Sequence, residues 1–164
     1  MNYDDLINTA VEAGYLLIAN GGEIYRAEES MLRIFRAYGV NTGEVFAIPT
    51  FINATVTTPQ GKPVTKIRRI ASRETNMDRV EQVNDLCRRI CRTTPDFAYI
   101  RRELARIERR PSFSFPVQTA AFAVVAFAFT LFYGGIWADA LVALVCGAVT
   151  KIVCHVLERF HMNS

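Results

Sequence analysis

The sequence predicts an α+β cytosolic domain, in the order helix–helix–three strands–helix–helix, followed by an all-α membrane hairpin of two transmembrane helices. Residues 1–110 carry 17 of the 19 Lys and Arg and 14 of the 16 Asp and Glu, which is typical of a water-facing domain. The 28 residues 111–138 carry no charge at all. Since about 20 apolar residues of helix cross a hydrocarbon core, we expect a soluble domain at 1–110 and a membrane region at 111–164.

Apolar residues at spacings of three and four predict the first two helices. In the first helix they form two adjoining rows, Leu6, Ala10, Ala13 and Leu17 beside Ile7, Val11, Gly14 and Ile18. Gly21 and Gly22 end that helix through a left-handed conformation. A second helix is expected from about Glu23 to Tyr38, with Gly39 after it.

The apolar period then changes to that of strands. The segments 44–48, 51–58 and 63–70 are rich in β-branched and aromatic residues, and residues 59–62 read as a hairpin loop. Two further helices follow, with apolar faces between residues 77 and 90 and between residues 97 and 107. Pro95 and Asp96 stand at the start of the second of these.

Two spans are expected at about 115–133 and 140–157. Tyr133 and Trp137 lie where an interfacial aromatic belt is expected, and a tight turn through Gly134 and Gly135 connects the spans. Both spans are rich in Ala and Gly, and small residues permit close contact of helices in lipid.

Charge places the predicted domain on one side of the membrane. The chain begins with acidic residues rather than with a basic, apolar signal peptide. Five arginines between residues 101 and 110 precede the first span, and positive charge flanking a span stays inside. We therefore expect a multi-pass protein of the bacterial cytoplasmic (inner) membrane with its N-terminal domain in the cytosol.

Composition argues against several classes of protein. Cys87 and Cys91, and Cys146 and Cys154, lack the spacing of zinc ligands, so neither a metal nor a cofactor is expected. Residues 68–110 hold 12 arginines and 7 acids. A basic helix before a span suits anionic lipid headgroups better than nucleic acid, and no RNA-binding motif accompanies it.

Several segments together resemble one family. They are Gly21-Gly-Glu-Ile-Tyr-Arg-Ala-Glu28, Ile48-Pro-Thr50, the polar strand 53–57, Thr65 with Arg68-Arg-Ile70, and Gly134-Gly-Ile-Trp-Ala-Asp139 followed by Gly147. The ordered set resembles the threonine/serine exporter (ThrE-like) family in its DUF1212-type N-terminal part. The early start of the first helix is similar to a split, YjjP-type subunit of that family.

The resemblance implies a secondary exporter of small carboxylate-bearing solutes, threonine/serine or a dicarboxylate such as succinate, and not an enzyme. It also implies an oligomer with a small YjjB-type membrane subunit. Members of this type continue into about three further spans, so we expect that the chain is truncated after its second span. No phosphate-binding loop for ATP is present in the sequence.

Five polar residues of the predicted domain are candidates for solute binding. Arg26 and Glu28 belong to the family-like segment, and an arginine presents a planar fork to a carboxylate. Arg26 could instead pair with Glu23 or Glu29 on a solvated face. Thr50 and Asn53 could line a polar cleft with Arg68, although alternation on a half-exposed strand explains them equally well.

Two ionisable residues accompany the second predicted span. Lys151 lies within it, and a charge inside a span is a functional-site hypothesis by default. It could face a carboxylate-bearing solute, or it could extend toward the headgroups. Asp139, at the outer turn, is a coupling candidate that could bind a proton or cation, or could cap the second span.

Two other functions remain open from the sequence. A membrane-tethered hydrolase would need a nucleophile with a base, yet the only histidines, His155 and His161, lie in or beyond the second span. A scaffold or sensor would bind a membrane partner through its basic helices without transporting anything.

Overall fold

The computed structural model describes residues 2–111 and 113–159, without the side chains of residues 158 and 159. It divides into two compact units, Met1–Arg110 and Pro111–Ser164. The elements in chain order are α1 (Tyr3–Ala19), α2 (Ile24–Ala37), β1 (Glu44–Ile48), β2 (Phe51–Thr57), β3 (Pro63–Arg69), α3 (Met77–Thr93), α4 (Phe97–Glu108), α5 (Phe115–Phe132) and α6 (Trp137–Arg159). This order confirms the predicted fold class, an α+β part followed by two apolar helices.

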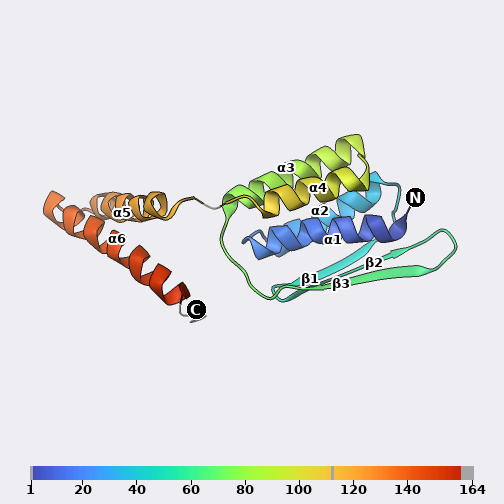
Figure 1. Ribbon diagram of the computed structural model, residues 1–164, viewed down its shortest axis with the longest axis horizontal. Coiled ribbons are helices and arrows are strands. Elements are labelled where there is room, and N and C mark those ends of the chain that lie inside the picture. Colours follow the sequence, from blue (N-terminus) through green and yellow to red (C-terminus); the bar gives the residue numbers. More distant parts are fainter. Residues whose placement is uncertain (1, 112, 160–164) are drawn as a thin grey trace. The chain divides into compact units, whose positions relative to one another are not determined.

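The N-terminal unit has three layers. Its antiparallel sheet has the order β1-β2-β3, and α1 and α2 pack on one face of that sheet. Helices α3 and α4 cover the side of α1 and α2 that is turned away from the strands (Figure 1). The core of the unit is therefore built around α1, which contacts all the other helices of the unit and two of the strands.

Helix α1 is buried on two sides because it lies between the layers. Eleven of its residues are buried, among them both of the apolar rows seen in the sequence. A helix that is apolar over most of its circumference is stable only inside a core. The helix ends at Ala19, and Gly21, just beyond the Asn20 cap, has a φ of +90° that favours glycine. The Gly22 N–H donates to the Leu17 carbonyl at 2.8 Å.

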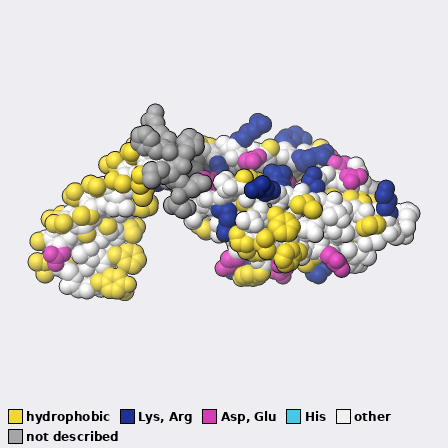
Figure 2. All heavy atoms as spheres, turned by 90° about the horizontal axis from the view of Figure 1, so that it is seen from below, with side chains coloured by type: hydrophobic (Ala, Val, Ile, Leu, Met, Phe, Trp, Pro, Cys, Tyr) yellow, Lys and Arg dark blue, Asp and Glu magenta, His cyan; other side chains and the backbone are white. Residues whose placement is uncertain are grey.

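The side chains of β2 alternate between a buried face of the sheet and a more exposed one. Ile52, Ala54 and Val56 are buried beneath α1, and the residues between them are half-buried. On the opposite face Phe46 is 58% exposed and Ile67 is 64% exposed. The space-filling view from below shows hydrophobic side chains gathered on this part of the unit (Figure 2).

Helices α3 and α4 begin at side-chain caps. The Asn76 side chain accepts from the Arg79 N–H, and the Asp96 side chain accepts from the Ala98 N–H, each at 3.1 Å. Such caps satisfy backbone donors that have no partner within the first turn. Both helices bury one apolar stripe, which ends in Ile90 on α3 and in Ile107 on α4.

The C-terminal unit consists of α5 and α6. The first ends at Phe132, close to the prediction, but α6 begins at Trp137, three residues before the expected start of the second span. Both are long and apolar enough to cross a membrane. Of the most apolar 18 residues of each helix, only 6% are buried in α5 and 11% in α6. Phe122 is 47% exposed and Val145 is 59% exposed. Continuous apolar surface of this kind suits lipid rather than water.

Candidate functional site

The contact between α5 and α6 depends on Gly147. A Cβ atom placed on Gly147 would lie 2.7 Å from the Phe122 carbonyl oxygen, 2.9 Å from the Ala126 Cβ and 3.1 Å from the Ala123 Cα. Two of these atoms belong to the backbone of α5, which cannot yield as a side chain can. The two helices are therefore in close contact because residue 147 has no side chain.

A groove of about 450 Å³ lies along this contact. Its lining comes from both helices and is mostly apolar, with the hydroxyls of Thr130 and Thr150 as its polar groups. Each hydroxyl donates to a backbone carbonyl one turn earlier, Thr130 to Ala126 at 2.9 Å and Thr150 to Cys146 at 2.8 Å. Because these donors are already engaged within their own helices, the groove offers a solute little beyond an apolar surface.

Lys151 lies one turn beyond Gly147 on α6. Its Nζ atom is 5.4 Å from the centroid of the Phe122 ring on α5, and the side chain is half-buried. An ammonium group over an aromatic face is attracted to the ring electrons, and the attraction is larger where water is scarce. The lysine is thus turned toward α5, although no carboxylate pairs with it among the described residues.

Asp139 lies in the first turn of α6. Its carboxylate accepts a hydrogen bond from the Ile136 N–H at 3.2 Å. A carboxylate at this position satisfies a free donor and complements the positive end of the helix dipole. This geometry is that of a helix cap, the second of the two roles considered for Asp139. Asp139 lies 12 residues, or roughly 18 Å of helix, before Lys151.

Arg26 and Glu28 have partners within the N-terminal unit. The Arg26 Nε atom is 2.6 Å from a Glu23 carboxylate oxygen and 3.1 Å from the Tyr25 hydroxyl. The hydrogen bond to Tyr25, followed by the charge of Glu23, raises the pKa of Arg26. Glu28 accepts the Ala47 N–H at 2.7 Å, so this carboxylate connects α2 to β1.

Arg68 forms a cluster with two residues of α1. Its guanidinium is 2.5 Å from a Glu12 carboxylate oxygen and lies over the Tyr15 ring, 4.0 Å from the centroid. Arg68 is directly opposite Ile52 in the sheet register, on the face that α1 covers. Burial raises the pKa of Glu12, and the charge of Arg68 opposes that rise without cancelling it.

The raised pKa of Glu12 predicts a pH dependence of stability. The folded state retains the Glu12 proton to a higher pH than the unfolded chain does, so wild-type stability falls as the pH rises above 4.5 through the raised pKa. Glu12→Gln removes this loss. We expect the free energy of unfolding of the wild type to fall relative to that of Glu12→Gln between about pH 4 and pH 7, measured by urea denaturation of the full chain in detergent. A difference that does not change with pH would contradict this origin.

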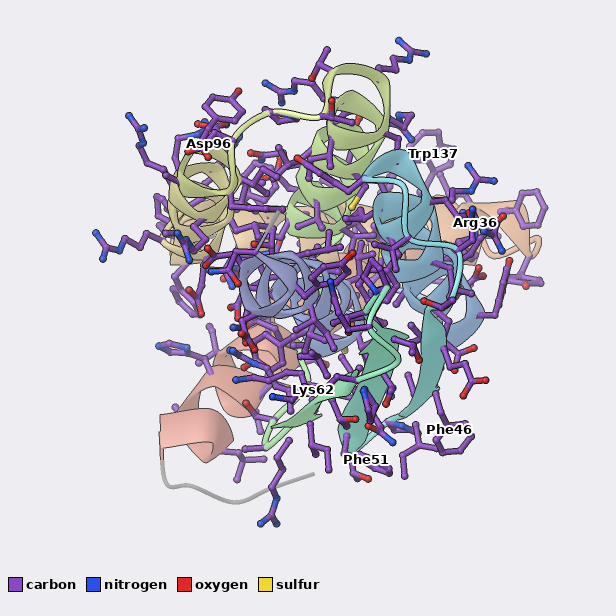
Figure 3. The ribbon with its side chains drawn as sticks, turned by 90° about the vertical axis from the view of Figure 1, so that its right-hand side faces the viewer. Arg36, Phe46, Phe51, Lys62, Asp96 and Trp137 are labelled. Carbon is purple, nitrogen blue, oxygen red and sulfur yellow. The ribbon has the colours of Figure 1, made fainter. Side chains whose placement is uncertain are left out.

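The polar residues of β2 lie on the other face of the sheet. Asn53 is opposite Phe46 and Ile67 in the register, and its Oδ1 atom is buried with no hydrogen-bond partner in the described chain. Thr55 exchanges a hydroxyl hydrogen bond with Thr65 at 2.9 Å. In the side-chain view Phe46 and Phe51 point away from the helices, on this same face (Figure 3).

Within the N-terminal unit, the structure does not bring Asn53 and Arg68 together. Asn53 and Arg68 lie on opposite faces of the sheet, so they do not line the cleft that the strand pattern allowed. Thr50 is exposed in the turn between β1 and β2, where its carbonyl accepts the Ile70 N–H at 2.8 Å. Glu12, which pairs with Arg68, was missed because its position in α1 shows no motif.

No group of three or more potential metal ligands is present in the described part of the chain. The four cysteines, all described, are free thiols. The His155 ring lies 4.5 Å from the Phe115 ring, measured between centroids, whereas His161 lies outside the described residues.

Comparison with known sequences identifies one relationship. A model of the family described as "Putative threonine/serine exporter" (ThrE) matches residues 8–164. The match covers both structural units. No curated protein and no solved structure matches the chain.

Proposed function

The chain belongs to the threonine/serine exporter family, and from that premise we propose that it is one subunit of a two-component secondary exporter. Membership and the two apolar helices make it a membrane protein of a transporter family. The family match across residues 8–164 is the observation that carries the proposal. The proposed solutes are threonine and serine, or a dicarboxylate such as succinate, and the proposed role is not enzymatic.

The proposed orientation places the N-terminal unit in the cytosol, next to the inner membrane. The arginines between residues 101 and 110 support it, because positive charge beside a span stays inside. Two helices rarely enclose a solute pathway, so the remaining wall would come from a small YjjB-type membrane subunit. Basic side chains next to the span would contact anionic headgroups.

Efflux measurements test the proposal. Cells that express the chain together with its proposed partner are loaded with labelled threonine or succinate, and loss of label is followed after dilution. Cells with the chain alone, the partner alone or neither serve as controls. We expect accelerated efflux only from cells with both subunits. Equal rates in all four strains would overturn the proposal.

Lys151 supplies a residue-level prediction for the same assay. If its ammonium group meets the solute carboxylate, Lys151→Ala removes a charge-assisted contact, and a loss of about tenfold in efflux rate is expected. Lys151→Arg keeps the charge and should retain most of the activity. The fluorescence of Trp137, the one tryptophan of the chain, checks that the hairpin is intact. Unchanged efflux from Lys151→Ala would remove this lysine from the solute pathway.

A further inference from the structure

Helices α2 and α3 enclose a groove in the N-terminal unit that the proposed function does not use. It has a volume of about 650 Å³, and we call it the arginine groove. Five of its lining residues are arginines and one is an acid: Arg26, Arg33, Arg36, Arg88, Arg92 and Glu29. The lining therefore carries an excess of positive charge, in a chain whose formal net charge is +3.

Three of the five arginines are neutralised by acids three or four residues away in the chain. Arg26 pairs with Glu23 at 2.6 Å, Arg33 pairs with Glu29 at 2.7 Å, and Arg88 pairs with Asp85. Within residues 2–111 and 113–159, no ion pair involves Arg36 or Arg92. The groove therefore retains two uncompensated positive charges.

These two arginines belong to the same end of the groove. Arg26 and Asn84 share a second cavity with Gly22 and Met77, which places the beginnings of α2 and α3 together. Farther along, the charge of Arg33 acts on the Cys91 thiol. The two helices thus run in the same direction, so their last turns, which carry Arg36 and Arg92, lie at one end. Arg36 extends outward from α2 (Figure 3).

The rest of the lining does not offset this charge. Burial raises the pKa of the Cys87 thiol to about 12, so it stays neutral at physiological pH. Ser30 and Asn84 add uncharged hydrogen-bonding groups. Threonine and serine have no net charge at neutral pH, whereas the groove has an excess of two positive charges. Threonine and serine therefore do not match the groove, whereas succinate, with two negative charges, has to be compared with phosphate by experiment.

We propose that the arginine groove binds a phosphate group, through Arg36 and Arg92. A phosphate monoester carries nearly two negative charges at neutral pH, which equals the excess in the groove. Guanidinium forks bind phosphate oxygens through paired hydrogen bonds. The phosphate belongs either to a soluble monoester or to a lipid headgroup. A headgroup phosphodiester carries one negative charge instead of nearly two, but it offers the same phosphate oxygens to the guanidinium groups.

A structural role for the same arginines makes the opposite prediction. Arg36 and Arg92 lie in the last turns of α2 and α3, where a positive charge complements the helix dipole. If that were their whole role, phosphate would not bind to them. Titration of the full chain with inorganic phosphate separates the two roles.

The test uses the full chain in phosphatidylcholine nanodiscs and isothermal titration calorimetry. We expect saturable phosphate binding by the wild type, at least tenfold weaker binding by R36Q/R92Q, and partial recovery in R36K/R92K. The control R69Q/R102Q removes the same charge from exposed positions on β3 and α4, outside the groove, and should bind within twofold of the wild type.

Nanodiscs that contain phosphatidylglycerol identify the source of the phosphate. If a lipid headgroup fills the groove, added inorganic phosphate no longer binds in the discs that contain phosphatidylglycerol. If the site takes a soluble phosphate, inorganic phosphate binds equally well in discs with and without phosphatidylglycerol. The proposal is overturned if the wild type binds no phosphate in phosphatidylcholine discs, or if R36Q/R92Q binds phosphate as well as the wild type. It is also overturned if the control R69Q/R102Q loses as much binding as R36Q/R92Q, or if succinate binds and phosphate does not.

Discussion

Gly147→Leu is expected to separate α5 from α6 and to abolish efflux. Even the first side-chain carbon would lie 2.7 Å from the Phe122 carbonyl oxygen, and leucine adds three more carbons at that contact. Overpacking of a fitted interface costs about 1–3 kcal/mol and occasionally more. The helices can relieve the clash only by moving apart, because the atoms in contact include the backbone of α5.

Trp137 reports this change directly. Its ring lies 5.9 Å from the Phe127 ring, measured between centroids, so its fluorescence follows the packing of α6 on α5. In detergent, Gly147→Leu should alter the emission and lower the unfolding temperature of the hairpin, and Gly147→Ala should do so to a smaller extent. Ala138→Leu, at an exposed position of α6, is the matched control and should resemble the wild type. Wild-type emission and efflux from Gly147→Leu would show that the close contact is dispensable.

The second large effect is expected in the N-terminal core. Phe35 is completely buried on α2, so Phe35→Ala leaves a cavity as well as losing buried apolar area. Such substitutions cost about 3–5 kcal/mol, a large part of the stability of a unit of this size. We expect the N-terminal unit to unfold at a markedly lower urea concentration, as followed by far-UV circular dichroism of the full chain in detergent.

Phe46→Ala provides the control with the same chemical change. Phe46 is 58% exposed on the outer face of the sheet, so its removal leaves no cavity and should cost well under 1 kcal/mol. Comparable losses from the two substitutions would mean that the outer sheet face is covered in the intact protein. The covered surface would then include the row formed by Phe46, Asn53 and Ile67.

The two substitutions also act on different units. Phe35 contributes to the core of the first unit, and Gly147 fixes the helix contact of the second. Efflux that is lost in Gly147→Leu but survives a partly destabilised N-terminal unit would assign transport to the hairpin and its partner. Loss in both would indicate that transport requires the N-terminal unit to be folded.

The sequence alone determined the order of the elements and the division into a charged part and an apolar part. These are local properties: the period of apolar residues separates helices from strands, and an uncharged stretch of sufficient length prefers lipid. Gly21 could also be assigned from its neighbours, and its φ of +90° agrees with the predicted helix end. Helix α6 begins at Trp137, three residues before the expected second span, and its first turn carries no strong local signal.

Only the tertiary structure decided which side chains meet. Arg68 pairs with Glu12 rather than facing Asn53, because the strand register and the packing of α1 assign Arg68 to the covered face of the sheet. The arginine groove exists because α2 and α3 run side by side, although about 40 residues separate them in the chain. Periodicity identifies a face of one element, whereas the partner of that face depends on how distant segments pack.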